Sequence, residues 1–316
     1  MNFSARAFLS SVLLIAGTLA GAEAPARPAQ PAVGPGSSEY AHKKIVSATF
    51  GNGDTQFWMY EPAEPKPANA PVVLLMHGWS AMQPLGYMAW IEHLVKRGNI
   101  VIYPRYQASL LTLPNTFLES SITAIKNALA ELQKEPHVKP DLTRVAALGH
   151  SFGAVLSANL AAVASQRGLP VIKALMPIEP GTGGFQVYED YSKIPAKTLL
   201  LCVAGSDDNF VRDIDAKRIF KGASSIAAED KDYITLITDR HGNPPLVADH
   251  FVAGALLRGA NAFHWYGLWK WFDALTDAAF YEKNRKYALG NTPEQRFLGK
   301  WSDGQLVTEP KITKEP

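Results

Sequence analysis

The pentapeptide Gly-His-Ser-Phe-Gly at residues 149–153 constrains the fold of this chain more than any other part of the sequence. It lies between an apolar run at 145–148 and a stretch of small residues that begins at Ala154. A G-x-S-x-G pattern between a strand and a helix is typical of a nucleophile elbow, a sharp turn that holds a serine in strained backbone. Glycines two positions either side of the serine keep side chains away from the adjoining strand and helix. We therefore predict that the hydroxyl of Ser151 is lifted clear of the sheet.

Strand and helix patterns alternate along most of the chain. Of its 316 residues, 47% are hydrophobic and 19% are charged, which is enough for one large core. Continuous apolar strands that alternate with helices indicate an α/β domain with a mostly parallel sheet, covered on both faces. We expect strands at 45–50, 56–60, 71–76, 100–103, 144–148, 171–176, 198–204 and 233–238, and helices at 85–96, 116–134, after Ser151 and over 263–272.

The two ends of the chain differ from this pattern. Arg6 precedes a short apolar stretch at 7–20, followed by a small-x-small site, so we interpret residues 1–22 as a cleaved signal peptide. Its shortness and the lack of a stop-transfer charge cluster favour a signal over a membrane anchor. Proline and alanine at 23–40 predict a flexible linker. We expect the folded domain at 41–285, with a C-terminal extension at 286–316 packed on it or trailing from it.

Charge and cysteine content exclude further classes of protein. The formal net charge of +2 at pH 7 is too small for a nucleic-acid-binding surface. The single cysteine, Cys202, excludes an intramolecular disulfide, and its place in an apolar run indicates a buried side chain. With the signal peptide, this predicts a periplasmic or secreted bacterial-type protein that keeps no stable membrane anchor after cleavage. The oligomeric state is left open.

Ser151 needs an acid partner as well as a base. A serine hydroxyl is a poor nucleophile at neutral pH, so it requires a histidine base that a carboxylate orients. After an elbow of this kind the order along the chain is serine, acid, histidine. The acid is expected after the strand at 198–204, where Asp207 and Asp208 are neighbours. Asp208 is preferred because it completes the spacing Gly-x-x-Asp-x-x-Val, whereas Asp207 suits a turn or a helix cap.

The base is expected after the last predicted strand, at 233–238. Its candidates are His241 and His250. His250 is preferred because the aromatic residue Phe251 follows it, a step that is typical of the start of the last helix in chains with an elbow of this kind. His241 precedes Gly242 and fits a polar loop position.

Two backbone N–H groups are also needed where negative charge develops on the carbonyl oxygen of a substrate. One is expected from Phe152, directly after the nucleophile. The second is expected from Trp79, in the sequence His-Gly-Trp that follows the strand at 71–76. The side chains of Trp79 and Phe210 are candidates for contacting the substrate.

Taken together, these motifs make the chain resemble the α/β-hydrolase superfamily, in particular its dienelactone-hydrolase-like, cutinase-like and polyesterase-like serine esterases, over about residues 40–280. The resemblance implies a central sheet of about eight strands. It also implies hydrolysis of carboxylic esters through an acyl-enzyme, with Ser151 as nucleophile, His250 as general base and Asp208 as its orienting acid. Neither a metal nor an organic cofactor is implied. The short interval at 176–198 leaves no room for a large lid domain, so we expect an open site.

The sequence leaves several functions open. The same three residues would support a lipase, a thioesterase or a peptidase, acting on a small or a polymeric substrate. An exported binding protein that has lost catalysis is an alternative of another class, although the intact serine, acid and histidine candidates argue against it. The pattern specifies how a bond is cut and not which molecule carries it.

Overall fold

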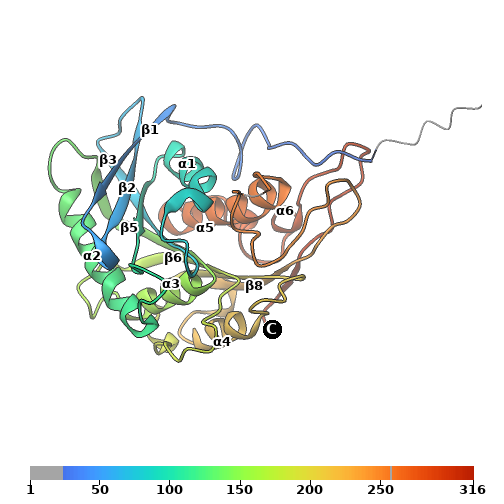
Figure 1. Ribbon diagram of the computed structural model, residues 1–316. Coiled ribbons are helices and arrows are strands. Elements are labelled where there is room, and N and C mark those ends of the chain that lie inside the picture. Colours follow the sequence, from blue (N-terminus) through green and yellow to red (C-terminus); the bar gives the residue numbers. More distant parts are fainter. Residues whose placement is uncertain (1–23, 257) are drawn as a thin grey trace, which may run out of the picture.

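The computed structural model describes residues 24–256 and 258–316, so the predicted signal peptide lies outside the described residues. A nine-stranded sheet in the order β1-β2-β4-β3-β5-β6-β7-β8-β9 runs through the molecule (Figure 1). Strands β3 to β8 are parallel, and β1, β2 and β9 are antiparallel to their neighbours. The strands are β1 Lys44–Phe50, β2 Phe57–Ala63, β3 Asn69–Met76, β4 Ile100–Pro104, β5 Lys139–His150, β6 Ile172–Ile178, β7 Leu199–Gly205, β8 Lys231–Leu236 and β9 Lys311–Thr313.

Helices cover both faces of the sheet, as predicted. Helices α2, α3 and α4 lie on one face, and α1 and α5 lie on the other (Figure 1). Alternate residues of each strand point to opposite faces, so in β3 Leu74 joins one buried cluster and Leu75 the other. The helices are α1 Met88–Lys96, α2 Phe117–Glu131, α3 Phe152–Val163, α4 Ile214–Gly222, α5 Trp269–Tyr281 and α6 Pro293–Arg296.

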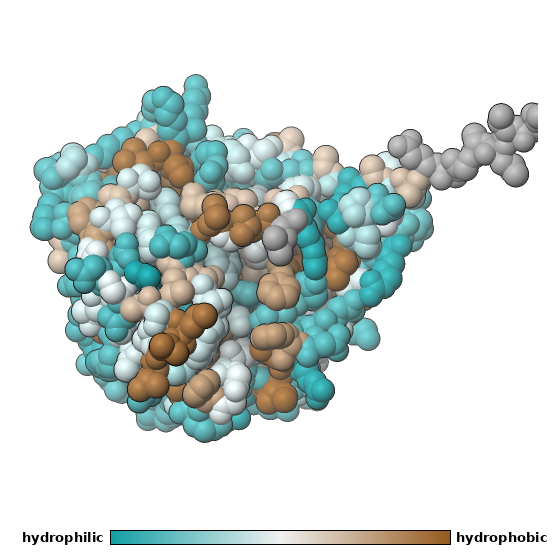
Figure 2. Space-filling view, in the orientation of Figure 1, coloured by the Kyte–Doolittle hydropathy of each residue, from teal (hydrophilic) through white to brown (hydrophobic). Residues whose placement is uncertain are grey.

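The prediction of a lidless domain is also confirmed within the described residues. Between β6 and β7 the chain forms one short 3-10 turn, Tyr191–Lys193, and no helical lid. None of the helices in the described ranges combines the length and the apolar character needed to cross a membrane. The face shown in Figure 2 is mostly hydrophilic, and its hydrophobic residues form separate patches.

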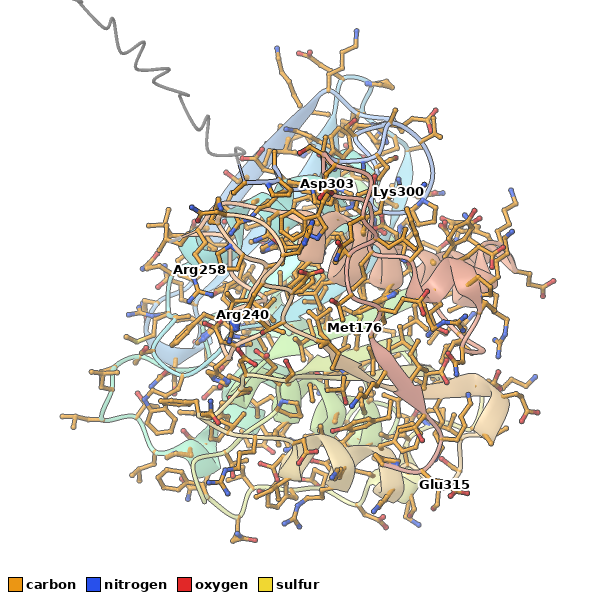
Figure 3. The ribbon with its side chains drawn as sticks, turned by 90° about the vertical axis from the view of Figure 1, so that its right-hand side faces the viewer. Met176, Arg240, Arg258, Lys300, Asp303 and Glu315 are labelled. Atoms are coloured by element: carbon orange, nitrogen blue, oxygen red, sulfur yellow. The ribbon has the colours of Figure 1, made fainter. Side chains whose placement is uncertain are left out.

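The ninth strand comes from the C-terminal extension. Residues 311–313 add to the edge of the sheet, where Ile312 pairs with Ile234 of β8. In Figure 3 this segment descends from Lys300 and Asp303 past the strands to Glu315. A strand of three residues has too little alternation for a sequence pattern to indicate it, which is why about eight strands were expected.

The segment predicted as a flexible linker packs against the domain, and this corrects the prediction. Arg27 donates to the carbonyl of Pro244 at 2.9 Å, and the amide of Ala26 donates to the hydroxyl of Ser302 at 2.8 Å. The amide of Gly36 donates to the buried carboxylate of Asp273 at 2.7 Å. A proline-rich segment cannot form a core of its own, but it can fill a groove on a core that already exists.

Asp273 connects this segment to two helices. Its Oδ2 accepts from Nε2 of His93, within α1, at 2.9 Å. The same oxygen lies 3.0 Å from Nε of Arg97, which directly follows α1. Burial opposes ionisation of the carboxyl, but His93, Arg97 and the amide of Gly36 outweigh it and lower the pKa of Asp273 below its usual value.

This arrangement predicts how the Asp273→Asn variant responds to acid. Because the folded-state pKa is depressed, the stabilisation by Asp273 is present above its unfolded pKa of about 3.9 and is lost as pH falls through the folded pKa. We expect urea unfolding at pH 7 to show that the variant has lost about 3 kcal/mol. The difference from wild type should shrink when the measurement is repeated toward pH 2.5. A difference that is constant over this range would contradict an ionised Asp273.

Candidate active site

The elbow has the strained geometry that its sequence predicts. Ser151 lies between β5 and α3 with φ 56° and ψ −123°, a conformation that is rare for a residue with a side chain. A Cβ on Gly149 would lie 2.1 Å from the carbonyl oxygen of Gly153. A Cβ on Gly153 would lie 2.2 Å from the carbonyl oxygen of His77. Both glycines are therefore required by the close approach of the helix to β5 and to the loop after β3.

The structure brings Ser151, His250 and Asp208 into one hydrogen-bonded chain. Nε2 of His250 lies 2.9 Å from Oγ of Ser151, and its Nδ1 lies 2.9 Å from Oδ2 of Asp208. The other oxygen of Asp208 accepts from the amides of Phe210 at 2.9 Å and Val211 at 3.0 Å. Burial opposes ionisation of Asp208, but the hydrogen bonds from His250 and these amides lower its pKa. The carboxylate is thus held ionised where it can stabilise an imidazolium.

The two competing residues lie in other contacts. Asp207 forms an ion pair with Arg240 at 2.6 Å, and His241 lies 2.7 Å from a carboxylate oxygen of Asp303. His250 lies in a loop of turns, and the last long helical segment begins later, at Phe263. The expectation that His250 begins a helix was therefore wrong, although its side chain faces Ser151.

Two amides beside Ser151 are available to an oxyanion. Phe152 is the first residue of α3, where an amide has no partner within the helix. Among the hydrogen bonds of the described residues, neither its amide nor that of Trp79 has an acceptor. The preceding amide, of Gly78, donates to the hydroxyl of Tyr87 at 3.1 Å. The structure thus leaves free the two donors that were predicted.

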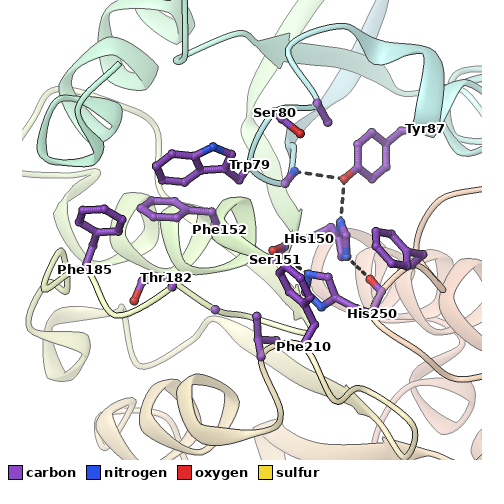
Figure 4. Close-up of a pocket in the computed structure, with 16 residues that line it drawn as sticks. Trp79, Ser80, Tyr87, His150, Ser151, Phe152, Thr182, Phe185, Phe210 and His250 are labelled. Carbon is purple, nitrogen blue, oxygen red and sulfur yellow. Dashed lines mark hydrogen bonds between the residues drawn. The ribbon is translucent and has the colours of Figure 1, made fainter. Parts of the chain in front are cut away.

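Ser151 and His250 line a largely apolar cavity of about 640 Å³. On one side the ring of Trp79 stacks on Phe185, with centroids 5.7 Å apart and an interplanar angle of 19°. On the other side Phe210 stacks on His250 with centroids 4.9 Å apart. Figure 4 shows these aromatic side chains around the serine. Phe185 was missed by the sequence analysis, because a phenylalanine in a glycine-rich loop has no local signal for facing a cavity.

A smaller cavity of about 200 Å³ adjoins the first. The two share Tyr87, His150 and Phe251 in their walls. Gly86 and Leu256 contribute to the smaller cavity, which we call the side cavity.

A buried carboxyl next to the site was also missed. Glu179 directly follows β6, is fully buried and has φ 46°. Neither of its carboxyl oxygens has a hydrogen-bond partner among the described residues. Burial, together with the charges of Asp208 and Asp249, raises its pKa well above the usual value, so the group is neutral. An acid directly after a buried parallel strand is the signal that could have indicated it.

Three side chains of the site have the composition of a metal site. His150, Glu179 and His250 have potential ligand atoms within 4.8 Å of one another. Both ring nitrogens of each histidine are already engaged, those of His250 by Ser151 and Asp208. A metal ion would therefore have to displace the contacts that orient His250.

A mostly parallel sheet with helices on both faces and a strained serine between β5 and α3 is the arrangement that the resemblance implied. A family model named chlorophyllase matches residues 53–196, and that family is part of the same superfamily of serine esterases. The chain has the α/β-hydrolase fold. No match was found among curated proteins.

The match covers less than half of the chain. It includes β2 to β6, the loop with Trp79 and the elbow, and it ends before β7. It supports a hydrolase that acts on esters. Asp208 and His250 lie beyond the matched residues, so the geometry is what relates them to Ser151.

Proposed function

We propose that this protein cleaves carboxylic esters through an acyl-enzyme. The observation that carries the proposal is the chain from Ser151 through His250 to an ionised Asp208, at the wall of an apolar cavity and beside two free amides. Oγ of Ser151 attacks the ester carbonyl carbon while Nε2 of His250 takes the hydroxyl proton. The amides of Trp79 and Phe152 stabilise the oxyanion, and His250 then protonates the departing alcohol oxygen.

Water completes the cycle. His250 removes a proton from water, which attacks the acyl carbonyl, and the proton returns to Oγ of Ser151 as the acid is released. These steps need only the residues described and water.

Ester hydrolysis by the purified mature chain tests this proposal. We expect release of p-nitrophenol from p-nitrophenyl butyrate and stoichiometric labelling by a fluorophosphonate. Parallel assays with a long-chain triglyceride, an acyl-thioester, a peptide and chlorophyll compare the alternatives; chlorophyll is included because the matching family is named chlorophyllase. Failure of labelling together with failure of every ester would overturn the proposal and favour a binding protein.

The walls of both cavities are mostly apolar, and the charged side chain of Arg258 in the side cavity is ion-paired with Asp249. Such walls favour an ester with an uncharged acyl part and an uncharged alcohol part. His250 must protonate the alcohol oxygen, so the alcohol leaves on the His250 side of Ser151. The side cavity opens on that side, since Phe251 follows His250 and the ring of His150 lies 5.0 Å from that of His250. We propose that the side cavity receives the alcohol part.

Gly86→Leu tests this assignment. Gly86 lines the side cavity and a Cβ built on it would meet no heavy atom within 4 Å, so a larger side chain has room to extend there. With the acyl group held constant, we expect kcat/KM to fall about tenfold for octyl butyrate and to change little for methyl butyrate. Gly86→Ala is the matched control and should have a smaller effect. Equal losses on both esters would contradict the assignment.

We also propose that the protein is exported, because residues 1–22 have the pattern of a signal peptide. Expression of the full chain in a bacterium, followed by N-terminal sequencing of the periplasmic and medium fractions, tests this. Full-length protein confined to the cytoplasm would contradict it.

A further inference from the structure

The second residue of the elbow, His150, takes part in a buried hydrogen-bonded network. Its Nδ1 lies 2.7 Å from the hydroxyl of Tyr87, and its Nε2 lies 2.6 Å from the backbone carbonyl oxygen of His250. The Tyr87 hydroxyl also accepts from the amide of Gly78 at 3.1 Å. Figure 4 shows the contacts of Tyr87, His150 and His250 as dashed lines.

The partners determine where the protons lie. A carbonyl oxygen can only accept, so Nε2 of His150 must carry a proton and donate it to His250. Nδ1 of a neutral ring is then an acceptor, and the Tyr87 hydroxyl donates to it while accepting from Gly78. Every donor in this network therefore has an acceptor when His150 is neutral.

The surroundings favour that neutral ring. Burial, together with the neighbouring His250 ring, lowers the pKa of His150 to about 4. Burial also raises the pKa of Tyr87 above its usual value. The closest carboxyl, of Glu179, lies 3.7 Å from Nε2 of His150 and is itself neutral. The network is thus uncharged at neutral pH, and Tyr87 and His150 are mostly buried, with 5% and 8% of their surfaces exposed where they line the two cavities.

The network joins two loops that act on opposite sides of the substrate carbonyl. Gly78 directly precedes Trp79, whose amide is one of the two oxyanion donors. At the other end, the carbonyl that accepts from His150 belongs to His250 itself. These loops follow β3 and β8, which β5, β6 and β7 separate in the sheet. A backbone hydrogen bond joins them, from the amide of Ala255 to the carbonyl oxygen of Gly86 at 3.1 Å. The side chains of Tyr87 and His150 add a second connection, which ends on His250 itself.

We propose that Tyr87 and His150 are positioning residues that hold the oxyanion loop and the His250 loop at their working separation. The inference rests on the proposed ester hydrolysis. Neither residue touches the reacting atoms through these bonds, so their loss should lower kcat more than it changes KM. A displacement of about 1 Å in such a site can cost about 100-fold in rate.

Paired substitutions at His150 separate the two ends of the network. In His150→Asn the amide oxygen can replace Nδ1 and accept from Tyr87, whereas in His150→Gln the amide NH₂ can replace Nε2 and donate to His250. We expect kcat for p-nitrophenyl butyrate to fall about tenfold in Tyr87→Phe and about 100-fold in His150→Ala. In the His150→Asn background the contact with Tyr87 is kept, so adding Tyr87→Phe should lower kcat a further severalfold. In the His150→Gln background that contact is already lost, so adding Tyr87→Phe should leave kcat unchanged.

Tyr191→Phe is the matched control. Its hydroxyl is buried and has no hydrogen-bond partner among the described residues, and it lies outside the network, so kcat should match wild type. Circular dichroism and thermal unfolding of each variant establish that it is folded. A wild-type kcat in both Tyr87→Phe and His150→Asn would overturn the proposal. A change in KM with no change in kcat would also overturn it.

An NMR measurement tests the network without relying on activity. In ¹⁵N-histidine-labelled wild type, we expect His150 to show the neutral Nε2–H tautomer throughout pH 5 to 8, with assignment from His150→Gln. An Nδ1–H tautomer or a charged ring would overturn the proposal even if esters are hydrolysed. If no ester is hydrolysed while the tautomer is as expected, the proposed function fails and the network stands as a structural feature.

Discussion

Ser151→Ala is expected to lower ester hydrolysis by about 10⁴- to 10⁶-fold while the protein remains folded. Oγ of Ser151 is the one hydroxyl held at 2.9 Å by His250 among the hydrogen bonds of the described residues. Alanine removes the attacking atom and leaves the two free amides in place, so weak binding of esters should persist. Substrate hydrolysis and fluorophosphonate labelling, measured on the same preparation, report the loss.

The control for this variant is another serine. Ser192 is exposed in the 3-10 turn between β6 and β7, and its hydroxyl contacts Asp190, so Ser192→Ala should hydrolyse esters at the wild-type rate. Thermal unfolding of Ser151→Ala should show a single transition close to that of wild type. Hydrolysis by Ser151→Ala at the wild-type rate would disprove its role as nucleophile.

His250→Ala is expected to cause a loss as large as that of Ser151→Ala, because the two residues act as a unit. Without Nε2 of His250, no group takes the proton from Oγ or returns it to the leaving alcohol. Asp208→Asn should lower kcat by about 10⁴-fold, since an amide would favour the wrong tautomer of the imidazole. Initial rates with p-nitrophenyl butyrate across pH 5 to 9 measure both losses.

The competing residues supply matched controls for this pair. His241 contacts Asp303, and Asp207 contacts Arg240, so both belong to the surface around the site. We expect His241→Ala and Asp207→Asn to retain kcat within about threefold, because neither side chain is hydrogen-bonded to Ser151, Asp208 or His250. A greater loss in His241→Ala than in His250→Ala would reassign the base.

The elbow and the sheet were predictable because they depend on local constraints. Gly149 and Gly153 are required where a helix passes within van der Waals distance of neighbouring backbone, and this requirement is visible in five residues. Apolar strands alternating with helices indicate a parallel sheet whatever the details of packing. The fold prediction was confirmed for these reasons, whereas the catalytic roles stay predictions until the variants are measured.

The contacts around the site were less predictable, because they depend on which loops the sheet brings together. Nothing local indicates that Tyr87 donates to His150, or that Glu179 lies buried beside it. The packed segment that contacts Asp273 was missed for a similar reason, since its own composition says nothing of the groove that it fills.

The sequence by itself determined that Ser151 stands on a strained turn of an α/β sheet, with acids and histidines following in the right order. Two aspartates and two histidines remained, because neighbours in sequence share one local pattern. Only the tertiary structure distinguished them, by pointing Asp208 toward His250 and His250 toward Ser151, while Asp207 points toward Arg240 and His241 toward Asp303. Chain order places a residue in a loop, whereas the packing of that loop on its neighbours decides where the side chain points.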